Sequence, residues 1–438
     1  MSPRPPAAGR HASGHATSGE VPPRARDLPL YGDRPPDWEP HGPDGEPHGP
    51  GGELHGPGGD FSGEGLSEED LPTGVRPAGL PPRLLILRAL GLGDLLAAVP
   101  ALRGLRRAFR QYETVLAAPR ALAPLASLTG AVDRLLPASA PDRDVPDGLD
   151  WRGPPPPVAV DLHGAGPPSH RLLTALGPRR VLAFAHPETP EIRGPEWRAE
   201  EHERERWCRL LTHYGIPADP RDLRLPHPAA ASPAPGAVLV HPGAEAPSRR
   251  WPARRWGEVI TALRSFGADA VVTGGPREEQ LLAETAESAR PRDTATRYAP
   301  PLPELAALVA DASAVLSGDT GVAHLAAAYG TPSVTLFGPV PPRLWGPPRS
   351  ARHRVLWHPG PPGDPHGHEV DPLLLRITPD EVVAAYQELD AAGELATRDA
   401  AGRASGPAGA AGPAGTTGTA GPAGTAERSG RGAERGGG

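Results

Sequence analysis

The sequence contains no lysine and no asparagine, so each of its 45 basic residues is an arginine. These two absences indicate a GC-rich coding sequence, and abundant arginine is therefore weak evidence for phosphate binding. The single cysteine, Cys208, excludes a disulfide within the chain and a cysteine-based zinc site. It also suits a cytoplasmic protein. The formal net charge of −7 argues against a general nucleic-acid-binding protein.

Long hydrophobic runs are also absent. No apolar stretch approaches the roughly 18 residues that a membrane-spanning helix needs. The chain does not open on the short apolar segment that is typical of a signal peptide. We therefore expect a cytoplasmic location.

Both ends of the chain are poor in apolar residues. Residues 1–80 are dense in Pro, Gly, His, Asp and Glu, which predicts a disordered arm because such a composition buries too little surface. Three His-Gly-Pro units begin at His41, His48 and His55; their imidazoles suit a metal, but a low-complexity tract without a ligand is the favoured interpretation. Glycine recurs at every third position from 406 to 424, within a predicted disordered tail (391–438).

Between these ends, continuous apolar runs alternate with amphipathic stretches, which is typical of parallel sheets covered by helices on both faces. The Pro-rich segment 226–236 interrupts the alternation, which then restarts. The fold class is therefore α/β, with two Rossmann-like, doubly wound domains at 81–230 and 231–390. Their ligand loops are expected at the carboxyl ends of the strands, facing a shared cleft. The expected strands are 84–87, 115–118, 158–160, 181–185, 237–241, 269–273, 314–317 and 333–337. The expected helices are 95–109, 121–128, 201–211, 253–263, 277–289, 303–311 and 322–329.

A Gly-rich turn, residues 88–94, follows the first predicted strand. Its glycines allow backbone to approach a ligand, and Asp94 stands where a helix begins. A carboxylate there serves as a helix cap or as a catalytic group, and the pattern leaves both open. Pro100 within the following helix predicts a kink or a restart. A dinucleotide site is disfavoured, because Leu96 occupies the third glycine position and Glu113 precedes the second strand.

The segment Ser317-Gly-Asp-Thr-Gly-Val-Ala-His324 joins a buried strand to a helix of small residues. The first amides of a helix lack partners and carry the positive end of its dipole, so residues 320–322 predict an anion site. Asp319 adds an acid to this site and His324 an imidazole.

Two further loops follow strands of the second half. Arg249 and Arg250 form a pair that suits a diphosphate, although a solvated pair is an equal alternative in so arginine-rich a chain. The loop after Thr273 carries acids that suit a ribose diol or simply the start of a helix. The Pro-rich loop 337–346 borders the expected cleft or serves as a plain connector.

No metal site is predicted. Asp142-Arg-Asp144 matches the paired-acid motif of metal-dependent sugar transfer, but it lies in a Pro-rich loop, and three-residue matches arise easily by chance. No Ser-His-Asp arrangement and no P-loop pattern stand out.

Taken together, the motifs resemble glycosyltransferase family 9, the heptosyltransferase-like group, over residues 83–385. The resemblance rests on Gly93-Asp94 with Pro100-Ala-Leu-Arg, His241-Pro-Gly, Arg250-Trp-Pro, Gly274-Gly-Pro, Asp319-Thr-Gly with His324, and Phe337-Gly-Pro. It implies a GT-B fold that binds the acceptor in its N-terminal domain. The C-terminal domain would bind a nucleotide-diphospho-sugar, ADP-heptose in the usual case. No metal and no cofactor is implied.

The resemblance assigns roles to individual residues. Asp94 would be the general base, which needs an ionised carboxylate within hydrogen-bond reach of the acceptor hydroxyl. The leaving diphosphate would meet Arg249 and the amides at Thr320 and Gly321. The remaining implied contacts are Glu278 with the ribose, Asp319 with the hydroxyls of the donor sugar, Gly243 and His324 with the donor, and Arg88 and Gly93 with the acceptor. For His324, contact with the donor and bracing of the turn are equal alternatives.

One departure concerns the acceptor side, because Asp161-Leu-His-Gly164 lacks the basic residue and serine that the family shows next. We expect an inverting, metal-independent glycosyltransferase that moves a sugar to a glycan or glycolipid, as in synthesis of the lipopolysaccharide core. Transient contact with the inner face of the membrane is part of this expectation, and nucleic acid is not. The alternatives are a sugar-nucleotide epimerase, a non-catalytic nucleotide-sugar-binding protein and, last, an NAD-dependent oxidoreductase.

Overall fold

The computed structural model describes residues 81–290 and 297–395, which belong to one compact unit of the chain, Ser62–Gly438. The predicted N-terminal arm, with its His-Gly-Pro units, lies outside the described residues. So does the Gly-X-Y tract with the rest of the tail after residue 395.

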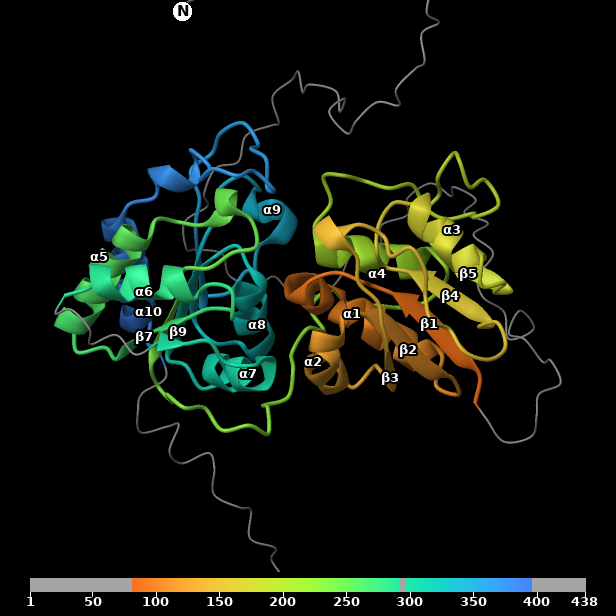
Figure 1. The fold of residues 1–438 in the computed structure, drawn as a ribbon, viewed down its shortest axis with the longest axis horizontal. Coiled ribbons are helices and arrows are strands. Elements are labelled where there is room, and N and C mark those ends of the chain that lie inside the picture. The colour runs from red at the N-terminus through yellow and green to blue at the C-terminus, as the bar shows by residue number, and fades with distance from the viewer. Residues whose placement is uncertain (1–80, 291–296, 396–438) are drawn as a thin grey trace, which may run out of the picture. The chain divides into compact units, whose positions relative to one another are not determined.

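The first half of the described chain forms a parallel sheet of five strands in the order β3-β2-β1-β4-β5 (Figure 1). Its strands are β1 (Arg83–Leu87), β2 (Glu113–Ala118), β3 (Arg134–Pro137), β4 (Val158–Asp161) and β5 (Arg180–Leu182). Its helices are α1 (Leu92–Ala108), α2 (Ala123–Leu128), α3 (Pro168–Thr174) and α4 (Glu203–His213). The central strands β1 and β4 are buried almost throughout, which explains their continuous apolar sequences.

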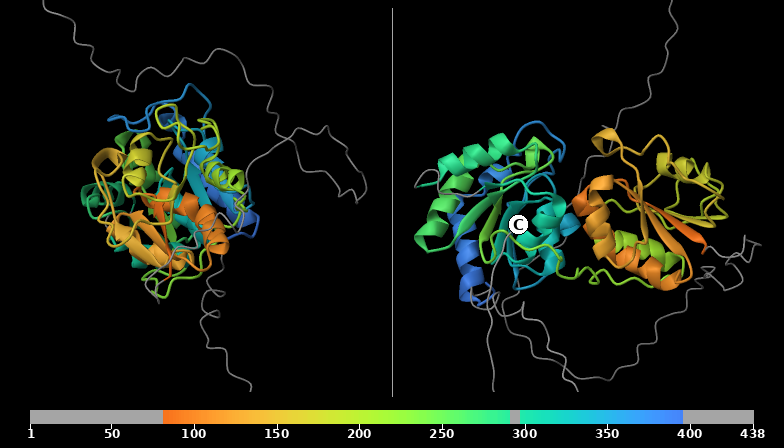
Figure 2. Two further views of the ribbon diagram at one scale, coloured as in Figure 1. Left: turned by 90° about the vertical axis from the view of Figure 1, so that its right-hand side faces the viewer. Right: turned by 60° about the horizontal axis from the view of Figure 1, so that its bottom comes forward.

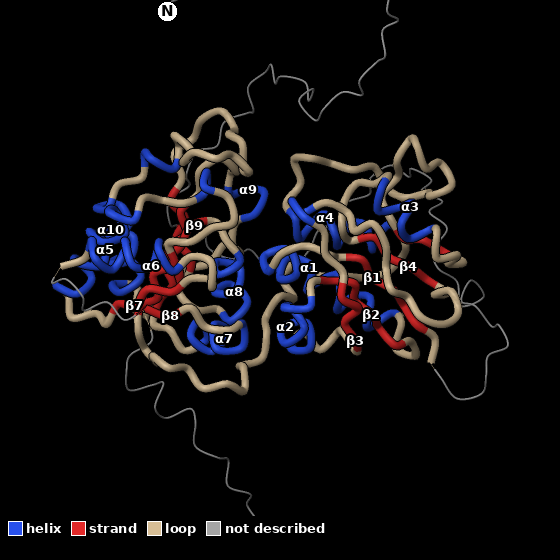
Figure 3. Tube along the Cα trace, viewed as in Figure 1, coloured by secondary structure: helices blue, strands red, loops and turns tan. Residues whose placement is uncertain are grey.

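The second half forms a six-stranded parallel sheet in the order β11-β10-β9-β6-β7-β8. Its strands are drawn in red in Figure 3, where β7, β8 and β9 are labelled. Its strands are β6 (Val238–His241), β7 (Ala270–Thr273), β8 (Arg297–Tyr298), β9 (Ala314–Gly318), β10 (Ser333–Leu336) and β11 (His353–Leu356). Its helices are α5 (Ala253–Ser265), α6 (Glu279–Ser288), α7 (Leu302–Ala310), α8 (Gly321–Tyr329), α9 (Pro342–Trp345) and α10 (Pro379–Ala391).

Helix α1 of the first half packs against helix α8 of the second (Figure 1, Figure 2). Small residues permit a close approach: a Cβ added at Gly321 would lie 2.8 Å from Leu92 Cβ, and one at Gly93 would lie 2.9 Å from His324 Cδ2. Leu95 and Leu102 belong to the same buried cluster as Leu325. The start of each helix therefore lies beside the start of the other.

Most of the expected elements are present, but helix α1 differs from its prediction. It begins at Leu92, one turn before the expected Leu95, so Gly93 and Asp94 are in its first turn. It also continues through Pro100 without the restart that the sequence suggested as one alternative. Pro100 is itself buried.

Several elements were not predicted, and the strands among them are short or partly exposed. Strands β3 and β11 are edge strands with half-buried or exposed residues, and strand β8 has only two residues. Helix α10 was not predicted, although Thr378 and Glu381 cap it reciprocally. No helix within the described residues is both long enough and apolar enough to cross a membrane.

Candidate functional site

A cavity of about 310 Å³ lies between the starts of α1 and α8. Residues from both halves of the chain line it. Its lining residues are Gly91, Leu92, Gly93, Asp94, Arg143, Glu245, Arg249, Asp319, Thr320, Gly321, His324, Val340, Trp345, Pro365 and His366. The cavity thus unites Asp94 with the predicted anion site, as the two-domain interpretation required.

Asp94 is buried and held by a ring of donors. Arg143 Nη2 lies 2.8 Å from each of its carboxylate oxygens, and the Gly91 amide donates to Oδ2 at 3.1 Å. Burial alone would raise the pKa of Asp94, but Arg88 and Arg143 outweigh it and keep that pKa below its usual value. The carboxylate is therefore ionised at neutral pH. Through the Gly91 amide it also caps the start of α1.

Arg88 lies behind Asp94 and is fully buried. Its guanidinium donates to Glu203 at 2.9 Å and to the carbonyl of Leu162, and it stacks over the ring of Trp207. It lies 3.4 Å from Asp94 Oδ1. Arg88 is not among the residues that line the cavity, and in the structure it contacts Asp94. Its contact with the acceptor stays a prediction.

The residues of the predicted anion site lie at the start of α8. Thr320 is the N-cap residue, and the amides of the first turn point out of a nine-residue helix. Arg249 donates to the carbonyl of Asp319 at 3.2 Å. Within the described residues, Arg249 Nε and Thr320 Oγ1 are buried without a hydrogen-bond partner. Buried donors rarely stay unpaired, so this site fits a polar, anionic ligand.

Burial shifts the pKa of Asp319 and the pKa of His324 toward the neutral form of each side chain. Burial raises the pKa of Asp319 to about 6. The charge of Arg249 lowers this pKa, and the charge of Asp94 raises it. Burial lowers the pKa of His324 to about 4, and Arg204 adds to this effect. The His324 ring meets Trp345 edge-on at 5.7 Å between centroids. A neutral imidazole can accept or donate a hydrogen bond without adding charge.

The other predicted donor residues lie nearby but do not line the cavity. Glu278 accepts from the Gly275 amide at 2.7 Å, and a Cβ at Gly243 would lie 2.3 Å from its carboxylate. Gly243 therefore has to be small for Glu278 to occupy this position. Their contacts with the donor stay predictions.

Sequence reasoning missed several lining residues. Arg143 was noticed only inside a chance motif, and Glu245 and His366 gave no signal because they lie in irregular loops. Val340 and Trp345 belong to the Pro-rich loop whose role was left open, and they place that loop at the cavity. The predicted Arg250 instead donates to the carbonyls of Ala244 and Glu245, so it shapes its own loop.

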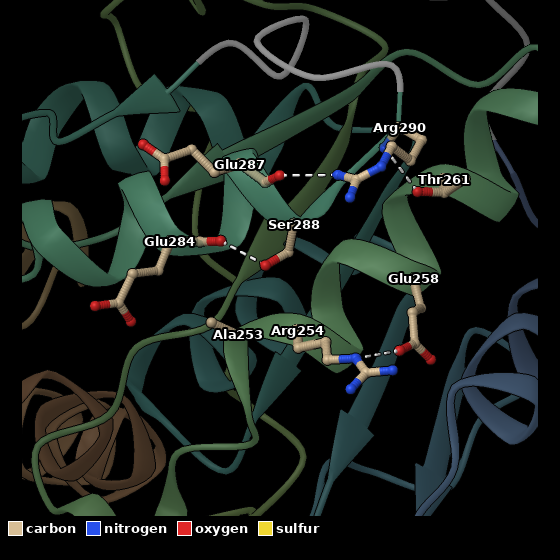
Figure 4. Close-up of a pocket in the computed structure, with 8 residues that line it drawn as sticks. All are labelled: Ala253, Arg254, Glu258, Thr261, Glu284, Glu287, Ser288 and Arg290. Carbon is tan, nitrogen blue, oxygen red and sulfur yellow. Dashed lines mark hydrogen bonds and ion pairs between the residues drawn. The ribbon is translucent and has the colours of Figure 1, made fainter.

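A second hollow lies on the outer side of α5 and α6 (Figure 4). Two of its polar side chains have partners within it: Arg254 pairs with Glu258 at 3.2 Å, and Ser288 donates to the carbonyl of Glu284 at 2.8 Å. It contains none of the predicted site residues. It also borders residues 291–296, which the structure does not describe.

Buried histidines predict acid sensitivity of the fold. Burial lowers the pKa of His170, His324 and His353 to about 4 each. The unfolded chain binds protons on these groups below about pH 6.5, so the free energy of unfolding falls as the pH drops from about 6.5 to 4. Asp319, whose folded pKa is about 6, acts in the opposite direction between about pH 4 and 6.

Three histidines outweigh one aspartate, so urea unfolding at about pH 5 should show lower stability than at about pH 7.5. The substitution His353→Asn should reduce this difference, because it removes one buried imidazole that accepts or donates to Ser333 at 2.9 Å. Equal stability at the two pH values would contradict the prediction.

Comparison with known proteins shows which family and fold this chain resembles. Residues 200–371 match glycosyltransferase family 9 (heptosyltransferase). Lipopolysaccharide heptosyltransferase 1 of Salmonella typhimurium is 26% identical over 292 residues, which are 60% of this chain and 90% of that protein.

Two solved structures share the fold. E. coli ADP-heptose lps heptosyltransferase II has a TM-score of 0.57 at 20% identity, covering 71% of this chain and 99% of its own. E. coli heptosyltransferase WaaC with ADP-2-deoxy-2-fluoro heptose has a TM-score of 0.52 at 20% identity, covering 70% and 99%. The GT-B prediction is thereby confirmed. The chain is therefore similar in sequence and in fold to the heptosyltransferases of glycosyltransferase family 9.

Proposed function

We propose that this glycosyltransferase moves a heptosyl group from ADP-heptose to a glycolipid acceptor of the lipopolysaccharide type, with inversion and without a metal ion. The names of the relatives motivate the donor and the acceptor. The observation that carries the proposal is the cavity itself, which sets an ionised carboxylate, Asp94, beside an anion site with buried, unpaired donors.

The division of labour follows from the chemistry of each group. Asp94 takes the proton of the acceptor hydroxyl as that oxygen attacks the anomeric carbon. The bond from that carbon to the diphosphate breaks, and Arg249 with the α8 amides takes up the developing charge. Asp319, neutral below about pH 6, contacts hydroxyls of the donor sugar. Glu278 contacts the ribose and Gly243 gives it room. The donor contact of His324 and the acceptor contacts of Arg88 and Gly93 complete the proposal.

The predicted domain limits, 81–230 and 231–390, belong to the same proposal, with acceptor and donor on opposite sides of the cavity. So do a cytoplasmic location and transient contact with the inner face of the membrane.

The test begins with donor binding. Thermal shift of the full chain against ADP-, GDP-, UDP- and dTDP-sugars should show stabilisation by ADP-heptose above the others. Arg249→Gln should weaken binding about 10- to 100-fold, because hydrogen bonds to charged groups are worth about 1.5–3 kcal/mol. Arg254→Gln is the matched control, since Arg254 is exposed and pairs only with Glu258 in the described contacts.

Transfer is then measured as release of ADP, with and without a heptose-deficient glycolipid and with and without EDTA. Release that needs the glycolipid and is unaffected by EDTA supports the proposal. Conversion of the sugar without acceptor would instead identify an epimerase, and binding without consumption would identify a non-catalytic sensor. A preference for another nucleotide sugar would overturn the donor assignment.

A further inference from the structure

Three side chains of alternating charge, Arg143, Glu245 and Arg249, join the Asp94 carboxylate to the anion site. Arg143 Nη2 contacts Asp94 at 2.8 Å, and Arg143 Nη1 lies 3.3 Å from Glu245 Oε2. The same Glu245 oxygen lies 3.8 Å from Arg249 Nη2. The Glu245 carboxylate therefore stands between two guanidinium groups at the rim of the cavity, where an anion is expected to bind.

In this state Asp94 is not free to act as a base. Its Oδ1 faces Arg143 and Arg88, and its Oδ2 accepts from Arg143 and from the Gly91 amide. A base needs a lone pair within hydrogen-bond reach of the hydroxyl that it deprotonates. One of these partners therefore has to leave before proton transfer.

Arg143 is the partner that is able to leave. Arg88 is 1% exposed and tied to a carbonyl and to Glu203, and the Gly91 donor is backbone. The Arg143 side chain is 27% exposed, and its second partner, Glu245, is 57% exposed. Arg143 also has a φ of 65°, the left-handed region that costs a non-glycine residue free energy. It is the last residue of the single 3₁₀ turn Pro141–Arg143.

We propose that Arg143 is a positioning residue that exchanges Asp94 for the diphosphate of the donor, which takes the place of Glu245 between Arg143 and Arg249 and thereby frees an oxygen of the base. A diphosphate carries more charge than a carboxylate and offers several oxygens to a guanidinium fork. Donor binding and release of the base are then one event. The inference rests on the proposed function, because it takes Asp94 as the base and a diphosphate as the ligand.

The surroundings of Asp94 define what a pH profile reports. The charged and titratable groups that face it are Arg88 after β1, Arg143 in the turn at Pro141, His163 after β4, Asp319 after β9 and His324 on α8. Glu203 on α4 pairs with Arg88. Of these, Asp319 titrates near pH 6 in the wild type. Removal of Arg143 leaves Arg88 as the remaining adjacent cation, so the pKa of Asp94 rises and the acid limb of kcat/KM moves to higher pH.

The experiment compares Arg143→Gln and Glu245→Gln in the full chain, with Arg134→Gln as a matched control on an edge strand, where Arg134 pairs with Glu113. The probes are ADP-heptose, ADP and inorganic pyrophosphate, the last containing the diphosphate alone. Arg143→Gln should weaken all three by about 10-fold, and Glu245→Gln should strengthen them about 3-fold because a competing carboxylate is lost. Arg143→Lys should restore part of the affinity.

The two variants are expected to differ in kinetics as well. Only Arg143→Gln should shift the acid limb upward and lower kcat, whereas Glu245→Gln should act mainly on the KM for the donor. If Arg143 were merely structural, its substitution would change the thermal stability, but Arg143→Gln and Glu245→Gln would not change the affinity in opposite directions. Unchanged affinity in Arg143→Gln, or affinity that Glu245→Gln leaves equal or weaker, would overturn the inference.

Failure of the inference is separable from failure of the proposed function. If Asp94→Asn turns over like the wild type, the base assignment is wrong, while pyrophosphate affinities still test the exchange. If Asp94→Asn is inactive but the two variants bind pyrophosphate equally, the base assignment stands and the exchange is wrong.

Discussion

Asp94→Asn is expected to reduce transfer by about 10²- to 10⁴-fold while leaving donor affinity within a few-fold of the wild type. The reason is chemical. An amide cannot accept the hydroxyl proton at neutral pH, whereas the wild-type carboxylate is ionised because Arg88 and Arg143 lower its pKa. The loss should appear in kcat, measured by ADP release at saturating donor, and the KM for the donor should change little.

The substitution is informative because asparagine preserves the local structure. Its side-chain oxygen still accepts from the Gly91 amide, which Asp94 does at 3.1 Å, so the first turn of α1 persists. Loss of the negative charge removes the carboxylate that Arg143 and Arg88 share, so a lower melting temperature is also expected. The control is Asp133→Asn, which removes the carboxylate from an exposed ion pair with Arg106. Turnover at the wild-type rate would remove Asp94 from the mechanism.

The fold was largely predictable because its central strands are buried on both faces. Strands β1 and β9 are uninterrupted apolar runs that end in polar turns, and in a parallel sheet such turns meet at one edge. This is why Asp94 and the turn at Asp319, more than 200 residues apart in the sequence, were expected at one cleft and are found lining one cavity.

The partners of the site residues were not predictable in the same way. Arg143 reaches Asp94 from a short 3₁₀ turn, and Glu203 reaches Arg88 across 115 residues. Neither contact follows from periodicity, since both depend on how loops and helices pack over the sheet. In a chain whose basic residues are all arginine, composition does not distinguish the two arginines at Asp94 from the others. The sequence accordingly left cap and catalyst open for Asp94, whereas the structure shows the cap contact together with two guanidinium groups.

Arg88→Met is expected to lower the free energy of unfolding by about 3–5 kcal/mol, the range typical when one partner of a buried ion pair is removed. Methionine fills much of the space under Trp207, but it leaves two buried carboxylates, Asp94 and Glu203, without their shared cation. Arg206 still pairs with Glu203 and Arg143 with Asp94. The pKa of Asp94 nevertheless rises, because the charge of Arg88 is the largest of the effects that lower it. Urea unfolding at pH 7 measures the loss.

A double-mutant cycle with Glu203→Gln separates packing from charge. If the cost comes from uncompensated carboxylates, Glu203→Gln should recover part of the stability in the Arg88→Met background and lower it in the wild type. A loss below about 1 kcal/mol in Arg88→Met, or strict additivity, would contradict this account. The predicted acceptor contact of Arg88 makes a separate claim. It requires the KM for the acceptor to rise in Arg88→Met at a temperature where the variant is folded, and to stay unchanged in Glu203→Gln, which perturbs the same buried cluster without removing the guanidinium.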